Sequence, residues 1–205
     1  MRPQFPLANS PIGTKQKAFQ QVLTSRDSSG AVVCERDASA FTYHPTHRHW
    51  HTEGVAEFEL RVGSPTGPAF VNDLGGQVKV KTTFCLIDWV KLVGSSTSGK
   101  NTTRTYFDCA GPFHGVSVDW TDQYHHATDD QDLDITGVKP GVTYYLVSTT
   151  NAGREFIEKD YTNNSAWQAF RVSRDSQGNP KIALGGYSLS CLEVRGLCGE
   201  QTSNR

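Results

Sequence analysis

The chain has 205 residues, of which 36% are hydrophobic and 10% aromatic, with 19 Gly and 9 Pro. These values are typical of one folded, turn-rich domain and exclude a disordered chain. The formal net charge of −1, without a basic run, excludes a nucleic-acid-binding footprint. No apolar stretch approaches the ~20 residues of a membrane span, and the first residues lack the apolar core of a secretory signal.

Strand patterns outnumber helix patterns along the chain. Segments rich in β-branched and aromatic residues are separated by Gly, Pro, Asn, Asp and Ser clusters, and no long amphipathic helical stripe is present. The predicted strands cover, in order, residues 55–62, 78–90, 115–120, 143–149 and 167–173. Short strands at this spacing predict an all-β fold, an antiparallel β-sandwich with long loops and little helix. We expect one domain over residues 1–205, with loosely held ends at 1–14 and 196–205.

A dense histidine run, HPTHRHWH, occupies residues 44–51. If this stretch is extended, alternate side chains point to one face, so His47, His49 and His51 converge on one ion. Three neutral imidazoles suit copper, zinc, iron or nickel and leave positions open for water or substrate. His44 lies off the alternate register and is a weaker candidate. The alternative is a surface strand with exposed histidines, but the spacing favours a metal site.

Five cysteines leave an odd number for pairing. Cys191 and Cys198 are close enough in the sequence for a local disulfide, and Cys85 and Cys109 flank a predicted hairpin, which would leave Cys34 free. The alternative is that all five are reduced, buried thiols. Short, loop-rich β domains often carry disulfides in oxidising compartments, which favours pairing.

Several motifs resemble those of the lysyl oxidase catalytic domain. HRHWHTEGVAEFELR (47–61) is followed by KTTFCLIDW (81–89), similar to the family patterns H-x-H-x-H and K-x-x-F-C-L-x-D. Further downstream, three more segments look like family segments: HGVSVDWTDQY, LDITGVKPGVTYYLVS and EKDYTNNSAW. The resemblance covers about residues 40–173, in the family's order. The chain is therefore identified as a member of this family, in a simple, microbial-type form.

The resemblance implies a copper-dependent amine oxidase. Enzymes of this family use O2, copper and a self-made lysine tyrosylquinone to convert primary amines, notably peptidyl lysine, to aldehydes, ammonia and hydrogen peroxide. By motif position, Lys81 and Tyr124 correspond to the catalytic residues that form the quinone, and His47, His49 and His51 to the copper ligands. It also implies an extracellular or secreted location and an amine or lysine-containing substrate.

The base that removes a proton from the substrate is left open by the resemblance. Asp122, close before Tyr124, is a candidate by proximity, against an ordinary role as a turn or edge-strand acid. His125 and His126 either tune the quinone pocket or are exposed, and His114 is either near the site or structural. Sequence order does not choose among these roles.

Two functions of other classes remain open. A non-catalytic metal-binding β-domain would keep the histidines without forming a quinone, so peptides with Lys81 and Tyr124 would be recovered separately. A zinc hydrolase with three histidine ligands would hydrolyse its substrate without consuming O2, although no carboxylate lies at a spacing that marks its general base. The acidic run at 128–134 is expected to be a solvated loop, the alternative being electrostatic attraction of cationic amines.

Overall fold

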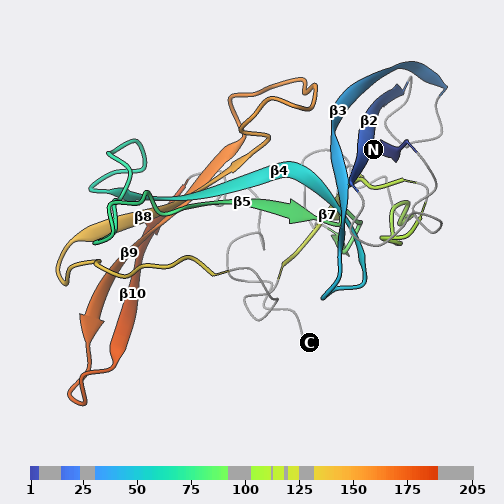
Figure 1. The fold of residues 1–205 in the computed structure, drawn as a ribbon. Coiled ribbons are helices and arrows are strands. Elements are labelled where there is room, and N and C mark those ends of the chain that lie inside the picture. The colour runs from blue at the N-terminus through green and yellow to red at the C-terminus, as the bar shows by residue number, and fades with distance from the viewer. Residues whose placement is uncertain are drawn as a thin grey trace.

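The computed structural model describes residues 1–4, 15–23, 31–91, 103–111, 113–117, 120–124 and 132–188, apart from the side chain of Lys81. Within these ranges every regular element is a β-strand (Figure 1). In chain order the strands are β1 (Arg2–Pro3), β2 (Lys15–Leu23), β3 (Val32–His44), β4 (His49–Val62), β5 (Lys79–Phe84), β6 (Val90–Lys91), β7 (Trp120–Thr121), β8 (Thr143–Thr150), β9 (Ser165–Arg174) and β10 (Pro180–Tyr187). All described pairings are antiparallel, which confirms the predicted all-β class.

Strand β4 organises the larger sheet. This eight-stranded sheet has the order β1-β2-β3-β4-β8-β9-β10, with β5 also paired to β4, while β6 and β7 form a separate two-stranded sheet. Strand β3 pairs with residues 49–52 of β4, and β8 pairs with residues 56–62. Because β5 and β8 both pair with residues 56–59, they occupy opposite edges of β4. Figure 1 shows the long β4 connecting the β2–β3 region to the β8–β10 region.

A bend divides β4 into two parts. The register with β5 shifts between Thr52 and Ala56, and Gly54 within this interval has φ +68°. Glycine adopts this left-handed conformation without steric cost, and a Cβ at this position would collide with the carboxylate of Glu155. The bend separates the end of β4 that carries histidines from the part that enters the main core.

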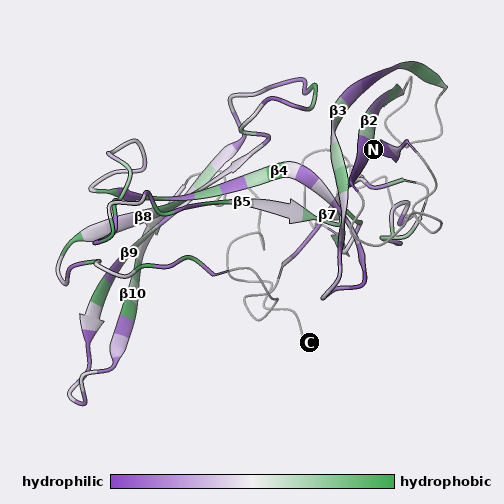
Figure 2. Cartoon of the chain, viewed as in Figure 1, coloured by the Kyte–Doolittle hydropathy of each residue, from purple (hydrophilic) through white to green (hydrophobic). Residues whose placement is uncertain are grey.

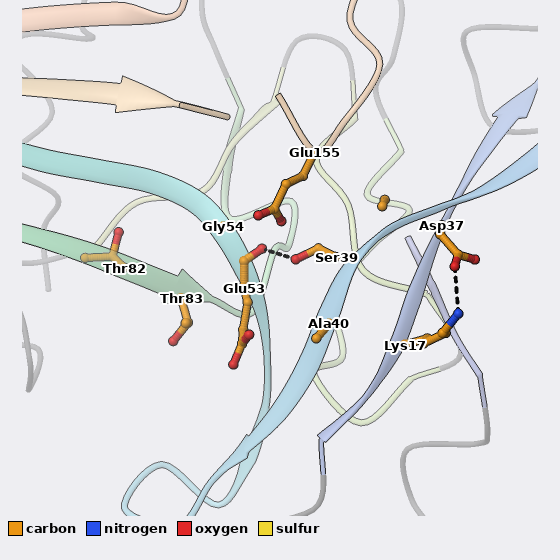
Figure 3. Close-up of a pocket in the computed structure, with 10 residues that line it drawn as sticks. Lys17, Asp37, Ser39, Ala40, Glu53, Gly54, Thr82, Thr83 and Glu155 are labelled. Carbon is orange, nitrogen blue, oxygen red and sulfur yellow. Dashed lines mark hydrogen bonds and ion pairs between the residues drawn. The ribbon is translucent and has the colours of Figure 1, made fainter. Parts of the chain in front are cut away.

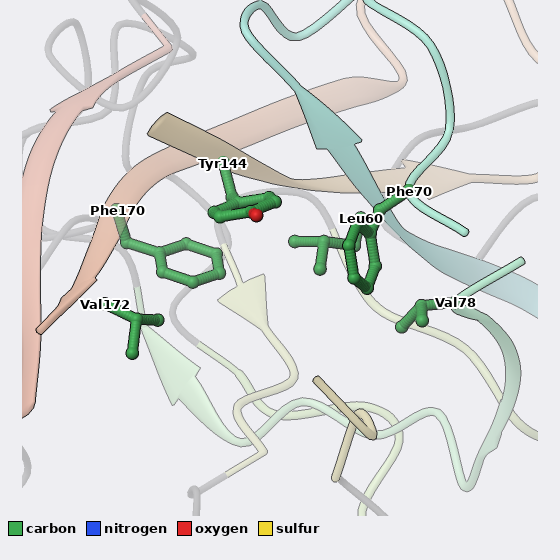
Figure 4. Packing of buried hydrophobic residues seen from close by; sticks show 6 residues of the cluster. All are labelled: Leu60, Phe70, Val78, Tyr144, Phe170 and Val172. Carbon is green, nitrogen blue, oxygen red and sulfur yellow. The ribbon is translucent and has the colours of Figure 1, made fainter. Parts of the chain in front are cut away.

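The main hydrophobic core lies on β4, β8 and β9 (Figure 4). Its buried members are Leu60, Phe70, Val78, Tyr144, Phe170 and Val172, and partly buried residues of the 133–142 segment pack against them. The Tyr144 ring contacts the Phe70 ring edge-on at 5.4 Å between centroids. Figure 2 shows hydrophobic and hydrophilic residues alternating along β4, as expected for a strand with one face on a core.

Two of the five predicted strands are shorter than expected. Of segment 78–90 only β5 and the first residue of β6 are strand, and of segment 115–120 only Trp120 is strand among its described residues. In segment 115–120 the buried carboxylate of Asp88 gives a physical reason. It accepts the backbone N–H of Ser117, together with those of Thr105 and Tyr106, so a side chain takes the place of a strand partner at Ser117.

Strands β1, β2, β3 and β10 were not predicted. Every residue of β10 is exposed, and most of the first half of β3 is exposed as well. Such strands carry no alternating hydrophobic pattern, which is the main strand signal in a sequence. The predicted loosely held ends lie mostly outside the described residues. In the part of the chain that is described, no helix is long and apolar enough to cross a bilayer.

Candidate metal centre

The four histidines of the run gather at the tip of the β3–β4 hairpin. Strand β3 ends at His44, β4 begins at His49, and residues 45–48 form the turn between them. Arg48 closes this turn with φ +58° and donates its backbone N–H to the carbonyl of His44 at 2.8 Å. The extended backbone on which the sequence prediction relied is therefore present from His49 onward, whereas His47 lies in the turn.

The ring nitrogens of the three predicted ligands nevertheless converge. Nε2 of His51 lies 2.9 Å from Nε2 of His49 and 3.4 Å from Nδ1 of His47. In the neutral imidazole one ring nitrogen carries a lone pair that can bind a metal ion. The hairpin thus brings together the nitrogen donors that the alternate spacing predicted, with a turn supplying one of them.

His44 belongs to the same cluster, although the sequence reading made it a weaker candidate. Its ring stacks on those of His47 and His51 at centroid distances of 4.3 and 4.8 Å. Ligand atoms of these three residues all lie within 4.8 Å of one another. His44 is paired with His49 across the hairpin, and cross-strand partners share a face. A prediction based on alternation along a single strand does not include such a cross-strand partner. The turn between them is the signal that would have revealed it.

Burial favours the neutral, metal-binding form of His49 and His51. The side chain of His51 is buried, and desolvation, followed by the neighbouring imidazoles, lowers its pKa to about 3. Desolvation also lowers the pKa of His49, with His47 and His44 as further causes. A hydroxyl orients the buried ring, since Nδ1 of His51 lies 2.9 Å from Oγ1 of Thr83 on β5. This contact leaves Nε2 of His51 facing the other imidazoles.

The cluster opens into a pocket of about 350 Å³. Its described lining comprises His47, His49, Cys85, Ile87, Trp89, Cys109, Asp122, Gln123 and Tyr124. Cys85 and Cys109 form a disulfide, which confirms one of the pairings considered from the sequence. Cys34 is free and exposed, and Cys191 and Cys198 lie outside the described residues.

Tyr124 is held in the pocket wall by backbone hydrogen bonds. Its hydroxyl accepts the N–H of Cys85 at 3.0 Å and donates to the carbonyl of Cys85 at 3.4 Å. Its ring packs against Phe84 at 4.2 Å between centroids. Burial, with a smaller contribution from the charge of Asp122, raises the pKa of Tyr124, so the group is a protonated phenol at neutral pH.

Lys81 is placed by its backbone only. It lies in β5 opposite Glu57 of β4, in the strand that leads to Cys85. Its side chain lies outside the part of the chain that the structure describes, so the distance between the Lys81 amine and the Tyr124 ring is not defined. The structure therefore brings His47, His49, His51 and Tyr124 into one site, and the cofactor role of Lys81 stays a prediction.

The other candidate groups from the sequence divide into two kinds. His114 is fully buried, with Nε2 3.0 Å from the Cys109 carbonyl and Nδ1 3.3 Å from Oγ1 of Thr52. These contacts are those of a structural residue. His125, His126 and most of the acidic run lie outside the described residues.

A larger pocket of about 660 Å³ lies where β2 to β5 meet the loop that carries Glu155 (Figure 3). It contains carboxylates, two of which are paired: Asp37 with Lys17 at 2.7 Å, and Glu53 with Lys15 at 2.6 Å. Figure 3 shows Glu53 and Glu155 near Gly54. Its described lining contains no imidazole, and we assign it no role in the metal centre.

The geometry defines an all-β protein with a cluster of imidazoles beside a buried phenol. The family model for lysyl oxidase matches residues 14–177, and the chain belongs to the lysyl oxidase family. The family that the motifs resemble is thus confirmed.

Curated relatives agree with this assignment. The chain is 30% identical over 126 residues to lysyl oxidase homolog 2A of Danio rerio, covering 61% of this chain and 15% of the relative. It is 31% identical over 126 residues to lysyl oxidase homolog 2 of Xenopus laevis, covering 61% and 14%. It is 29% identical over 127 residues to lysyl oxidase homolog 3 of Homo sapiens, covering 62% and 15%. The matched part spans about 15% of the length of these relatives.

Proposed function

We propose that this protein is a copper-dependent amine oxidase that converts primary amines, such as peptidyl lysine, to aldehydes with release of ammonia and hydrogen peroxide. Lys81 and Tyr124 together form its lysine tyrosylquinone, and His47, His49 and His51 bind the copper. The observation that carries the proposal is that two of these imidazoles and the phenol of Tyr124 line one pocket. Membership of the lysyl oxidase family supports it.

The donor set fits a copper ion. Imidazole nitrogen is a preferred ligand of copper, and the buried His51 is neutral and therefore ready to bind. The hydroxyl of Thr83 fixes the orientation of its ring. When bound, copper and the quinone supply the redox chemistry with O2 that protein side chains lack.

The residues of the chain position the reacting groups. Two hydrogen bonds to the Cys85 backbone hold the Tyr124 hydroxyl, and Phe84 holds its ring. Ile87, Trp89 and the disulfide provide apolar walls against which the alkyl part of an amine substrate can pack. Strand β5 contributes both Lys81 and Thr83, which links the proposed cofactor lysine to the strand that orients the metal cluster.

A secreted, extracellular location is part of the same proposal. The Cys85–Cys109 disulfide supports it, because disulfides persist in oxidising compartments and are rare in the cytosol.

Peptide mapping of copper-loaded protein tests the proposal. We expect one cross-linked peptide containing positions 81 and 124, a carbonyl that reacts with phenylhydrazine, and peroxide release on addition of an alkylamine. Lys81→Ala should bind copper but give neither the cross-link nor peroxide. Lys79→Ala is the matched control, since Lys79 lies on the same strand in an ion pair with Glu57 at 2.7 Å, and it should behave as wild type.

Three results would contradict the proposal. Recovery of both peptides separately and unmodified from copper-loaded protein would indicate a non-catalytic metal-binding domain. Hydrolysis of a substrate by the zinc form without O2 consumption would indicate a zinc hydrolase. Normal turnover in Lys81→Ala would remove this lysine from the mechanism.

A further inference from the structure

Asp122 carries a buried oxygen that the fold leaves unused. Its Oδ2 atom is inaccessible to solvent and has no hydrogen-bond partner among the described residues. Buried polar atoms in folded proteins are nearly always paired, so an unpaired carboxylate oxygen costs stability and is a sign of a functional role. The position of Asp122 in the wall of the 350 Å³ pocket indicates what that purpose is.

The small β6–β7 sheet holds this carboxyl group in place. Asp122 directly follows β7, which pairs with β6 through Val90 and Lys91. The backbone N–H of Trp89 also donates to the carbonyl of Thr121 at 3.1 Å. The carboxyl is thus carried by a paired backbone segment and lines the same pocket as Tyr124 and the imidazoles of His47 and His49.

We propose that Asp122 is the general base of the amine oxidation, a catalytic role that rests on the function proposed above. Its carboxylate accepts the proton from the carbon next to the substrate nitrogen. The quinone proposed on Tyr124 would take up the electron pair of the broken C–H bond, and O2 would accept these two electrons as hydrogen peroxide. Water would supply the aldehyde oxygen as ammonia leaves. The balance is RCH2NH2 + O2 + H2O → RCHO + NH3 + H2O2.

The electrostatic surroundings suit this role. Burial, with a smaller contribution from the negative charge of Asp88, raises the pKa of Asp122 to about 7. Backbone hydrogen bonding from Ile87 and the charge of Arg104 act in the opposite direction. A base whose pKa lies near neutral pH is partly ionised, and it also retains the proton that it accepts, which is the optimum for general base catalysis.

Asp122→Asn tests the proposal, because the amide keeps the shape of the side chain and cannot accept the proton. The control is Asp132→Asn, which removes an exposed acid from the described end of the acidic run. In single-turnover reduction by an alkylamine, we expect Asp122→Asn to be slower by about 10²–10⁴-fold, with wild-type copper content and wild-type phenylhydrazine-reactive carbonyl. The control should match wild type in all three measurements.

A second readout does not depend on activity. In the metal-free protein, carbon-13 NMR of labelled aspartate should show one carboxyl that titrates near pH 7 in wild type and is missing in Asp122→Asn. An Asp122→Asn variant that holds the carbonyl and reduces it at the wild-type rate would overturn the role of Asp122.

If Asp122→Asn does not form the carbonyl, Asp122→Glu replaces it in the same experiment. This variant keeps a carboxylate but displaces it by one methylene, and we expect slowed reduction with a retained deuterium isotope effect at the substrate carbon. A wild-type rate in Asp122→Glu would count against the proposal. Absence of the carbonyl from wild type itself would instead refute the proposed function, so the two failures are distinguishable.

Discussion

The hydroxyl of Thr83 lies 2.9 Å from Nδ1 of His51 and thereby connects β5 to the imidazole cluster. The register of the sheet sets this contact, because Thr52 of β4 is paired with Phe84 of the antiparallel β5, which places Thr83 diagonally across from His51 on the same face. With Nδ1 engaged, Nε2 of His51 faces His49 and His47. Thr83 is therefore the expected positioning residue of the proposed metal centre.

Thr83→Val should weaken copper binding by about 10–100-fold, because loss of a partner that orients a ligand typically costs this much affinity. Competition with a chelator of known affinity measures the effect. Thr82→Val is the matched control, since the Thr82 hydroxyl donates to the carbonyl of Ala56 and faces no imidazole in the described contacts. It should lose about 1 kcal/mol of stability and keep its copper affinity. Equal copper affinities in the two variants would exclude a positioning role.

His49→Ala should abolish stoichiometric copper loading and the phenylhydrazine-reactive carbonyl together. Nε2 of His49 lies against Nε2 of His51, and the residue lines the pocket that contains Tyr124. Metal analysis and a quinone stain of the same sample measure both quantities. Arg48→Gly is the control, because Arg48 is the exposed residue next to His49. Glycine adopts the φ of +58° that this turn position requires. Normal quinone yield in His49→Ala would contradict the copper role of this residue.

Asp122→Asn should stabilise the metal-free protein at high pH. The pKa of Asp122 is raised in the folded state from 3.8 to about 7, so the folded protein binds this proton more tightly than the unfolded chain. Its contribution to stability is thus fully present below about pH 4 and is lost as pH rises through 7. At about 1.4 kcal/mol for each pKa unit, the variant should exceed wild type by roughly 2–4 kcal/mol at pH 8.

Urea denaturation between pH 4 and 8 measures the difference in the free energy of unfolding between Asp122→Asn and wild type. This difference should disappear at pH 4. Asp88 and Arg104, whose charges act on Asp122, are unchanged in the variant and are therefore common to both proteins. A wild-type protein that gains stability over Asp122→Asn as the pH rises would show that the carboxylate is well paired.

Replacing both Cys85 and Cys109 with Ser should lower the free energy of unfolding by about 3 kcal/mol, the chain-entropy estimate for a disulfide that closes a loop of this length. The two cysteines are separated by 24 positions. The variant should also weaken amine binding, since both residues line the pocket. Cys34→Ser, at an exposed free thiol, should change neither property. Urea denaturation of the wild type and both variants measures the free energies of unfolding. Equal midpoints for the wild type and the double variant would contradict the predicted contribution of the disulfide.

The sequence predicted which imidazoles converge better than it predicted their local backbone. Alternate histidines indicated a metal centre, and the nitrogens of His47, His49 and His51 do converge in space. The premise of a continuous strand was wrong at His47, and His44 was undervalued, because a hairpin brings residues together that alternation along one strand keeps apart. Strands with a buried face were predictable, whereas the exposed β3 and β10 carry no such pattern.

The amino-acid sequence by itself determined the all-β class, the candidate donor residues and the family, because residue type and spacing specify strand propensity and ligand chemistry directly. Only the tertiary structure decided which distant residues meet. The pairing of β4 with β5 brings Thr83 to His51, and the backbone of Cys85 holds Tyr124. The unpaired oxygen of Asp122 is likewise a property of burial. Desolvation and long-range contact arise from the packing of the whole chain, and no local stretch of residues encodes them.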